Sequence, residues 1–134
     1  MAGKRTAAPK KKEGREPDRP RPLNQLIKEV FTEAQRSRAA QIIVHTAPPV
    51  VQLWGETELL SERSVPAPLL PGLVSKLKKL ARLDIADRRT PQQGSFRMLE
   101  SSGLAGEFIV KTLPDGTSEN LTVDCSFRAP LQIQ

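Results

Sequence analysis

Two stretches of the chain repeat apolar residues at the spacing of an amphipathic helix. Between residues 23 and 38 the apolar positions lie three, one, three, one and three residues apart, which places them in one stripe along a helix. Pro22 stands just before this stretch, where the missing backbone N–H of a proline costs little. Residues 69–83 repeat apolar side chains with a similar period. We therefore predict two helices, each with one face packed on a core.

The second predicted helix is also basic. Its positive side chains stand beside the apolar stripe rather than opposite it, and they are Lys76, Lys78, Lys79 and Arg82. A helix of this kind is compatible with binding at a membrane surface. We favour a core helix with a solvated basic rim, because predicted strands surround it in the sequence.

Other stretches have the composition or the alternation of β-strands, namely residues 39–45, 50–54, 95–99, 107–113 and 120–127. Pro48 and Pro49 separate the first two, which allows a hairpin but excludes a tight primed turn. Residues 61–71 carry three prolines and are predicted as a loop or the approach to a helix. The order α-β-β-α-β-β-β predicts an α+β domain, with an antiparallel sheet of about five strands and two main helices on one face.

The positive charge of the chain is concentrated near its start. The 134 residues include 21 Lys+Arg and 15 Asp+Glu, a net charge of +6. Residues 1–22 hold eight basic and three acidic side chains and therefore carry a net charge of +5 (8 − 3). The other residues together carry a net charge of only +1 (6 − 5). Because these residues have almost no large apolar side chains, we predict a disordered, proline-rich tail over 1–22. The α+β domain is then expected over 23–128, followed by a short tail over 129–134.

The basic run Lys10-Lys11-Lys12 leaves two interpretations open. It is suited to contact with a phosphate backbone or an anionic membrane surface, but we favour a solubilising leader, because short basic runs are unspecific as motifs. The predicted domain is nearly neutral and has no platform of aromatic and basic residues, which argues against a nucleic-acid-binding domain. The chain has neither the apolar core of a signal peptide nor a transmembrane run, so we expect a cytoplasmic protein.

Few residues offer catalytic chemistry. The chain has no Gly-x-x-x-x-Gly-Lys-Ser/Thr stretch and therefore no P-loop. His45 is the only histidine and Cys125 the only cysteine, so a structural zinc site and an internal disulfide are excluded. Asp84 and Asp87 lie three residues apart, but nothing in the sequence supplies the cleft and the partner that acid–base catalysis needs. We expect no metal, no cofactor and no enzymatic activity from this chain.

One block of sequence is more specific. Residues 73–96 combine the basic helix with Leu-Asp-Ile-Ala-Asp-Arg-Arg at 83–89 and Pro-Gln-Gln-Gly at 91–94. This block resembles the signature of the type II secretion and type IV pilus assembly ATPases, where a similar helix is followed by Leu-Asp-Ile-Ala-Glu-Arg-Arg and then Pro-Gln-Asp-Gly-Arg. A more general likeness extends over residues 23–127.

The resemblance implies the PAS-like domain that precedes the RecA-like ATPase core in that family. There it packs against a neighbouring subunit in a hexameric ring and contributes arginines near the nucleotide. The chain ends at Gln134, where the core would begin, so the resemblance implies no ATP hydrolysis here. Some positions depart from the family pattern: Gln93 replaces an aspartate, Ser95 replaces an arginine, and residues 50–56 contain no arginine. The scaffold pattern is retained, and the departures fall mostly at ligand-facing positions.

We therefore expect a non-catalytic adaptor, or an assembly or regulatory module, that contacts a secretion or pilus ATPase or another secretion-apparatus protein. Formation of a homo-oligomer stays an open alternative. The residues expected to contact the partner are Arg88, Arg89, Gln92, Gln93, Lys76, Lys79 and Arg82. A nucleotide-binding regulatory domain that uses Arg88 and Arg89 against phosphates is the second hypothesis, and a nucleic-acid or membrane binder that uses the tail is the third. The two arginines are also suited to capping the helix C-terminus, where cations are favoured.

Overall fold

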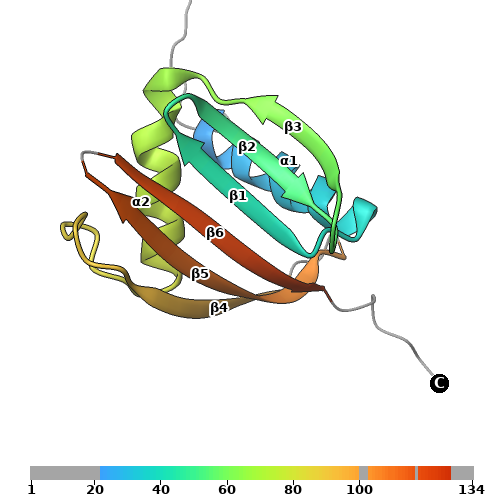
Figure 1. Cartoon of the computed structure of the whole chain (residues 1–134). Helices are drawn as coiled ribbons and strands as arrows, with labels where there is room; N and C mark the ends of the chain where they lie inside the picture. Colours follow the sequence, from blue (N-terminus) through green and yellow to red (C-terminus); the bar gives the residue numbers. More distant parts are fainter. Residues whose placement is uncertain (1–21, 100–102, 117, 128–134) are drawn as a thin grey trace, which may run out of the picture.

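The computed structural model describes residues 22–99, 103–116 and 118–127. Two α-helices and one six-stranded antiparallel sheet make up this part of the chain (Figure 1). The helices are α1 (Pro22–Ser37) and α2 (Leu70–Leu80), the latter preceded by a 3₁₀ turn, η3 (Ala67–Leu69). The strands are β1 (Gln41–Thr46), β2 (Pro49–Trp54), β3 (Leu59–Ser64), β4 (Gln93–Leu99), β5 (Ala105–Asp115) and β6 (Ser118–Phe127). They lie in the order β3-β2-β1-β6-β5-β4.

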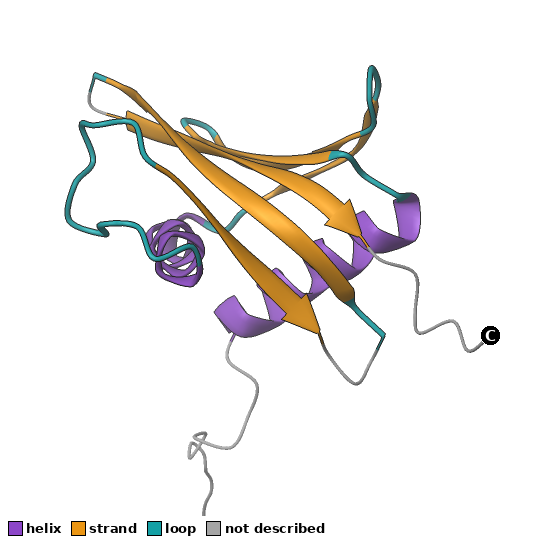
Figure 2. Ribbon diagram, turned by 90° about the horizontal axis from the view of Figure 1, so that it is seen from below, coloured by secondary structure: helices purple, strands orange, loops and turns teal. Residues whose placement is uncertain are grey.

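Both helices cover the same face of the sheet (Figure 2). Between the two layers lies a core formed by the apolar stripe of each helix and by alternate residues of the central strands. Phe31 of α1 meets Phe108 of β5 edge to face, with ring centroids 5.0 Å apart, and Phe96 of β4 stacks on Phe108 at 5.1 Å. Burial of side chains of this size contributes about 1.5–3 kcal/mol each. The predicted α+β class, with two helices on one face, is confirmed.

The expected number of strands was one too low, because β3 lies partly in the stretch predicted as a loop. This strand is at the edge of the sheet and pairs only with β2. Its side chains are mostly exposed, so they show none of the apolar alternation by which a half-buried strand is recognised. The three prolines of that stretch all follow β3, at Pro66, Pro68 and Pro71.

The hairpin between β1 and β2 is confirmed, and its turn has two residues. Thr46 pairs with Pro49, and the peptide bond between Ala47 and Pro48 in the turn is cis.

Each helix ends at an arginine in the left-handed conformation. Arg38 follows α1 with φ 58°, and Arg82 follows the end of α2 with φ 62°. After each of these residues the chain turns back, so that Ala39 N donates to Ala34 O at 2.8 Å and Leu83 N donates to Lys78 O at 2.8 Å. These bonds satisfy carbonyls that the helix end leaves free. Since α2 ends at Leu80, the helix is shorter than the predicted 69–83.

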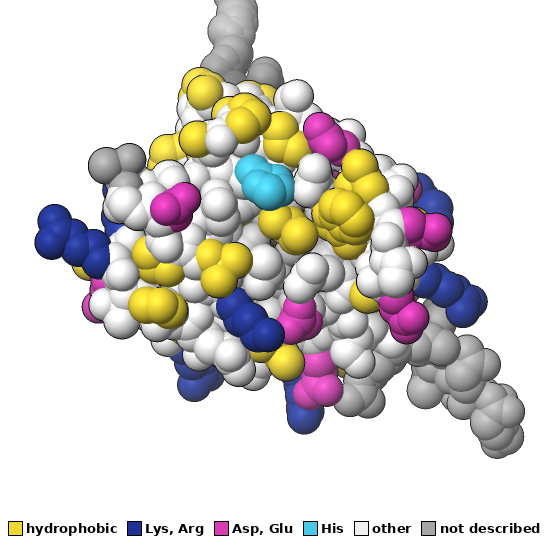
Figure 3. All heavy atoms as spheres, viewed as in Figure 1, with side chains coloured by type: hydrophobic (Ala, Val, Ile, Leu, Met, Phe, Trp, Pro, Cys, Tyr) yellow, Lys and Arg dark blue, Asp and Glu magenta, His cyan; other side chains and the backbone are white. Residues whose placement is uncertain are grey.

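The second face of the sheet carries no helix in the described part of the chain (Figure 2). Apolar, acidic and basic side chains are interspersed on it (Figure 3). His45 lies on this face, with Nε2 2.9 Å from Gln52 Oε1, and the same oxygen accepts a hydrogen bond from Trp54 Nε1 at 3.0 Å. The lone histidine therefore belongs to a surface hydrogen-bond network.

Candidate functional site

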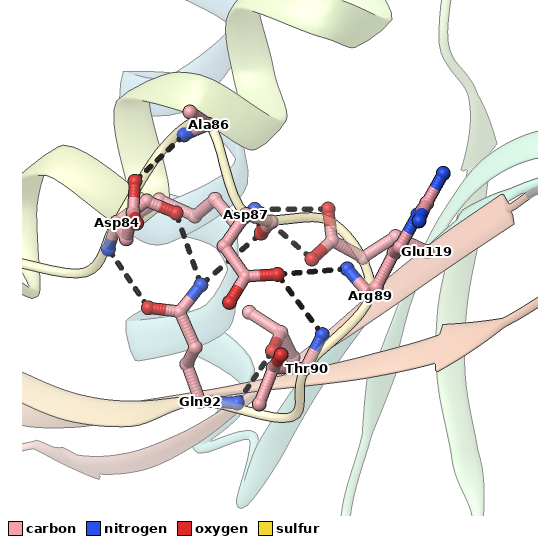
Figure 4. A network of polar contacts seen from close by, with 9 residues as sticks. Asp84, Ala86, Asp87, Arg89, Thr90, Gln92 and Glu119 are labelled. Carbon is pink, nitrogen blue, oxygen red and sulfur yellow. Dashed lines mark hydrogen bonds and ion pairs between the residues drawn. The ribbon is translucent and has the colours of Figure 1, made fainter.

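The loop between α2 and β4, residues 81–92, contains the sequence block that resembles the secretion ATPases. Two aspartates shape it through hydrogen bonds to nearby backbone (Figure 4). Asp84 Oδ1 accepts from Ala86 N at 3.0 Å, and Asp87 Oδ1 accepts from both Arg89 N and Thr90 N at 3.0 Å. Aspartate commonly folds the backbone of a turn in this way. The hydrogen bonds from Arg89 and Thr90 also lower the pKa of Asp87 below its ordinary value.

Gln92 fastens the two ends of this loop together. Its side-chain Nε2 donates to Asp84 O at 3.0 Å and to Asp87 O at 3.2 Å, while its Oε1 accepts from Asp84 N at 2.8 Å. Its backbone is tied to β5, because Gln92 N donates to Thr112 Oγ1 at 2.8 Å and Thr112 N donates to Gln92 O at 2.9 Å. The amide of Gln92 therefore holds the loop in shape, and its predicted contact with a partner stays a prediction.

A buried ion pair between α2 and β6 contacts the loop. Lys78 of α2 is 1% exposed, and its Nζ donates to Asp87 O at 2.9 Å and to Glu119 Oε1 at 3.0 Å. Glu119 Oε2 lies 2.9 Å from the same nitrogen, yet it accepts no hydrogen bond from any residue that the structure describes. A buried lysine is stable only with such partners, because charge is expensive to remove from water.

The sequence interpretation placed Lys78 on the solvated basic rim of the helix, and this is wrong. A signal for burial was available, because Val74, Leu77, Lys78 and Ala81 have the i, i+3, i+4, i+7 spacing of one helix face. Its partner has a matching signal, since Glu119 alternates with the buried residues Leu121 and Val123 along β6. Both charged residues thus stand at core positions of their elements.

A cavity of about 510 Å³ opens beside the ion pair. The start of α2, the loop and the start of β6 surround it, and its lining includes Leu70, Val74, Ile85, Arg88, Lys78 and Glu119. Arg88 and Arg89 are both exposed, and only Arg88 lines the cavity. Neither guanidinium makes a hydrogen bond or an ion pair within the described ranges. In Figure 4 the side chain of Arg89 extends away from the hydrogen-bonded network.

The other predicted contact residues lie around this loop. Lys76 is half-buried on α2, Lys79 and Arg82 are exposed at its end, and Gln93 is exposed as the first residue of β4. None of them lines the cavity that holds Arg88. The last carbonyls of α2 accept hydrogen bonds from the backbone N–H groups of residues 81–83, and among the described contacts neither arginine donates to them, so the interpretation that the two arginines cap the helix is wrong.

The remaining chemical groups are structural. Burial raises the pKa of the Cys125 thiol to about 12, with the charge of Asp124 contributing. A thiol with so high a pKa is protonated at neutral pH, whereas the thiolate is the nucleophilic form. Between residues 22 and 127, leaving out 100–102 and 117, no group of three His, Cys, Asp or Glu side chains is placed to hold a metal ion. No helix in the same ranges has both the length and the apolar character needed to cross a membrane.

Comparison with known proteins places the whole domain in one family. The family described as Type II/IV secretion system protein matches residues 16–129. Type II secretion system protein E of Klebsiella pneumoniae is 33% identical over 104 residues, which cover 76% of this chain and 21% of that protein. The protein HxcR of Pseudomonas aeruginosa is 34% identical over 109 residues, covering 76% of this chain and 22% of HxcR. The HofB homolog of Haemophilus influenzae is 26% identical over 117 residues, which cover 84% of this chain and 25% of that protein.

The class of protein that the sequence and fold define is an N-terminal domain of the secretion ATPases, distinct from their catalytic core. The chain belongs to the Type II/IV secretion system protein family. It spans about a fifth to a quarter of the length of the curated relatives it matches. The predicted resemblance to the type II secretion and type IV pilus assembly ATPases is therefore confirmed.

Proposed function

We propose that this chain acts in the cytoplasm as a non-catalytic adaptor or assembly module, through contact with a secretion or pilus ATPase or another protein of the secretion apparatus. The observation that carries the proposal is the loop between α2 and β4. Two aspartates, Gln92 and the buried Lys78 fix its shape, while the exposed guanidinium groups of Arg88 and Arg89 form no hydrogen bond or ion pair with the residues that the structure describes. A rigid loop that displays charge binds a partner with little loss of conformational entropy.

The hydrogen bonds made by the two aspartates of the loop lie outside the core. Asp84 and Asp87 bond to backbone groups of the loop itself, and these bonds are exposed. They fold the stretch of backbone that carries Arg88 and Arg89. Loops positioned in this way on a rigid scaffold commonly carry binding residues. This supports a contact role for the two arginines.

A pull-down tests the proposal directly. The full chain is immobilised and incubated with the secretion or pilus ATPase from the same cell, at low and at high salt. We expect the wild-type chain to retain the ATPase, and Arg88→Glu with Arg89→Glu to reduce retention strongly, because an attractive charge becomes a repulsive one. The matched control is Arg36→Glu, which reverses a similarly exposed arginine on α1. Absence of retention by the wild-type chain, or equal retention by all variants, would contradict the proposal.

A further inference from the structure

The cavity beside Arg88 has an apolar wall and a neutral floor. Leu70 and Val74 of α2 form one side, and Ile85 of the loop forms another. Ile85 is 43% exposed, so an apolar side chain stands at the mouth without being buried by the chain itself. On the floor, the charges of Lys78 and Glu119 cancel each other at 2.9 Å. The wall formed by Leu70, Val74 and Ile85 is therefore suited to an apolar group, whose burial against it is favourable by about 25 cal/mol per Å².

One charge of the lining is left without compensation. Lys78 and Glu119 form a pair, whereas the guanidinium of Arg88 has no hydrogen bond or ion pair with any described residue. Arginine binds carboxylates with two parallel hydrogen bonds, which makes it selective for that group. The charge at the rim is thus complementary to an acidic side chain.

A ligand that complements both the apolar wall and the positive charge has an apolar group next to a carboxylate, as a short segment of a protein can provide. We propose that the cavity binds a segment in which an apolar residue stands next to an aspartate or glutamate. The apolar side chain enters between Val74 and Ile85, and the neighbouring carboxylate pairs with Arg88. The inference rests on the proposed function, since it assigns the chemistry of the partner surface that the loop contacts.

The shape of the site requires no rearrangement before binding. Arg88 stands between Asp87 and Arg89, and both of these residues take part in the hydrogen bonds that fix the loop. The mouth residue Ile85 lies between Asp84 and Ala86, which are joined by another of these bonds. Because the backbone of the site is already folded by these bonds, binding of a segment carries little further cost for ordering the loop.

Two model peptides test the inference without knowledge of the natural partner. Acetyl-Gly-Leu-Asp-Gly-amide and its Leu-Asn counterpart are titrated into the ¹⁵N-labelled full chain at low salt, and amide shifts are followed by NMR. We expect saturable shifts at Ile85, Ala86 and Arg88 with the Leu-Asp peptide. Binding of the Leu-Asn peptide is expected to be about fivefold weaker, which is the effect of one exposed ion pair.

Three variants locate the binding. Arg88→Ala is expected to reduce affinity for the Leu-Asp peptide to that for Leu-Asn, and Ile85→Ser to weaken both peptides. Arg36→Ala is the matched control, because this arginine is exposed on α1 and does not line the cavity. All three positions are on the surface, so the variants keep the fold, which the dispersion of their spectra verifies. Affinity for the Leu-Asp peptide that is unchanged in Arg88→Ala, or that is lost equally in Arg36→Ala, would overturn the inference.

The pull-down separates failure of this inference from failure of the proposed function. If the ATPase is retained but neither peptide shifts the cavity residues at millimolar concentration, the cavity inference is wrong and the adaptor function stands. If the Leu-Asp peptide binds as expected but no ATPase is retained, the cavity inference stands and the proposed function is wrong.

Discussion

Removing one member of the buried ion pair will destabilise the domain strongly. Lys78 and Glu119 are 1% and 3% exposed at their side chains, so the partner left behind cannot reach water. Glu119→Leu leaves the Lys78 ammonium with the carbonyl of Asp87 as its remaining hydrogen-bond acceptor. Breaking a buried pair in this way costs about 3–5 kcal/mol. We expect urea unfolding, followed by circular dichroism, to show a loss of this size in the free energy of unfolding.

The double variant gives the sharper result. Lys78→Met with Glu119→Leu removes both charges and fills the site with apolar groups of similar volume. Replacing a complete buried pair in this manner is often neutral or stabilising. The carbonyl of Asp87 loses the ammonium but still accepts from Gln92 Nε2 at 3.2 Å, so it is not left without a donor. We expect the double variant to recover most of the stability lost in either single variant.

The reasoning would be refuted if the double variant lost as much free energy of unfolding as the two single variants together. If the two single losses add in the double variant, the side chains do not act as a pair and the loss comes from packing alone. A loss below about 1 kcal/mol in Glu119→Leu, typical of exposed pairs, would contradict the burial itself. Glu33→Leu is the control, because this residue pairs with Arg36 at 3.0 Å in solvent and is expected to cost little.

Three further predictions concern the scaffold. Gly94→Ala will destabilise the domain by about 1–3 kcal/mol in urea unfolding, because a Cβ there would lie 2.3 Å from Ala81 O, and an unchanged midpoint would contradict this. Arg38→Gly and Arg82→Gly will each raise stability by up to about 1 kcal/mol in the same assay, since glycine relieves the left-handed conformation that ends each helix; a loss would refute it. The Cys125 thiol is expected to react slowly with thiol reagents in the native state, and rapid labelling of the folded chain would contradict this. Burial raises the pKa of this thiol to about 12 in the folded chain, so above about pH 9 the unfolded chain binds fewer protons than the folded chain. The free energy of unfolding will therefore fall as the pH rises above about 9.

The elements of the fold are predictable from the sequence where one face is buried. The apolar stripe around Phe31 in α1 and the alternation around Phe108 in β5 both mark core positions, and the structure confirms them. The edge strand β3 gave no such signal, because its residues bury little on either face. Sequence patterns record burial, and an exposed strand is held by backbone hydrogen bonds that any residue provides.

The candidate site is predictable in position but not in detail. Its sequence block indicated the loop, and the loop does display Arg88 and Arg89. The function of Gln92 as a clamp depends on backbone groups eight and five residues away, at Asp84 and Asp87. Such contacts form only after the chain has folded back on itself, so residue type and spacing do not reveal them. Lys78 was missed for another reason, because its charge was given more weight than its place on the apolar stripe.

The most direct test of the central claim is a site-specific photo-cross-link between this chain and its partner. Burial raises the pKa of the native Cys125 to about 12, so we expect a cysteine introduced at an exposed position to take up the label in preference to it. Gln93→Cys places a benzophenone label at the end of the loop, and Ser126→Cys places it at the opposite end of the sheet, where Ser126 is exposed beside Glu107. After illumination with the ATPase from the same cell, we predict a cross-linked product from position 93 and little from position 126. Equal cross-linking from both positions, or none from either, would contradict the account.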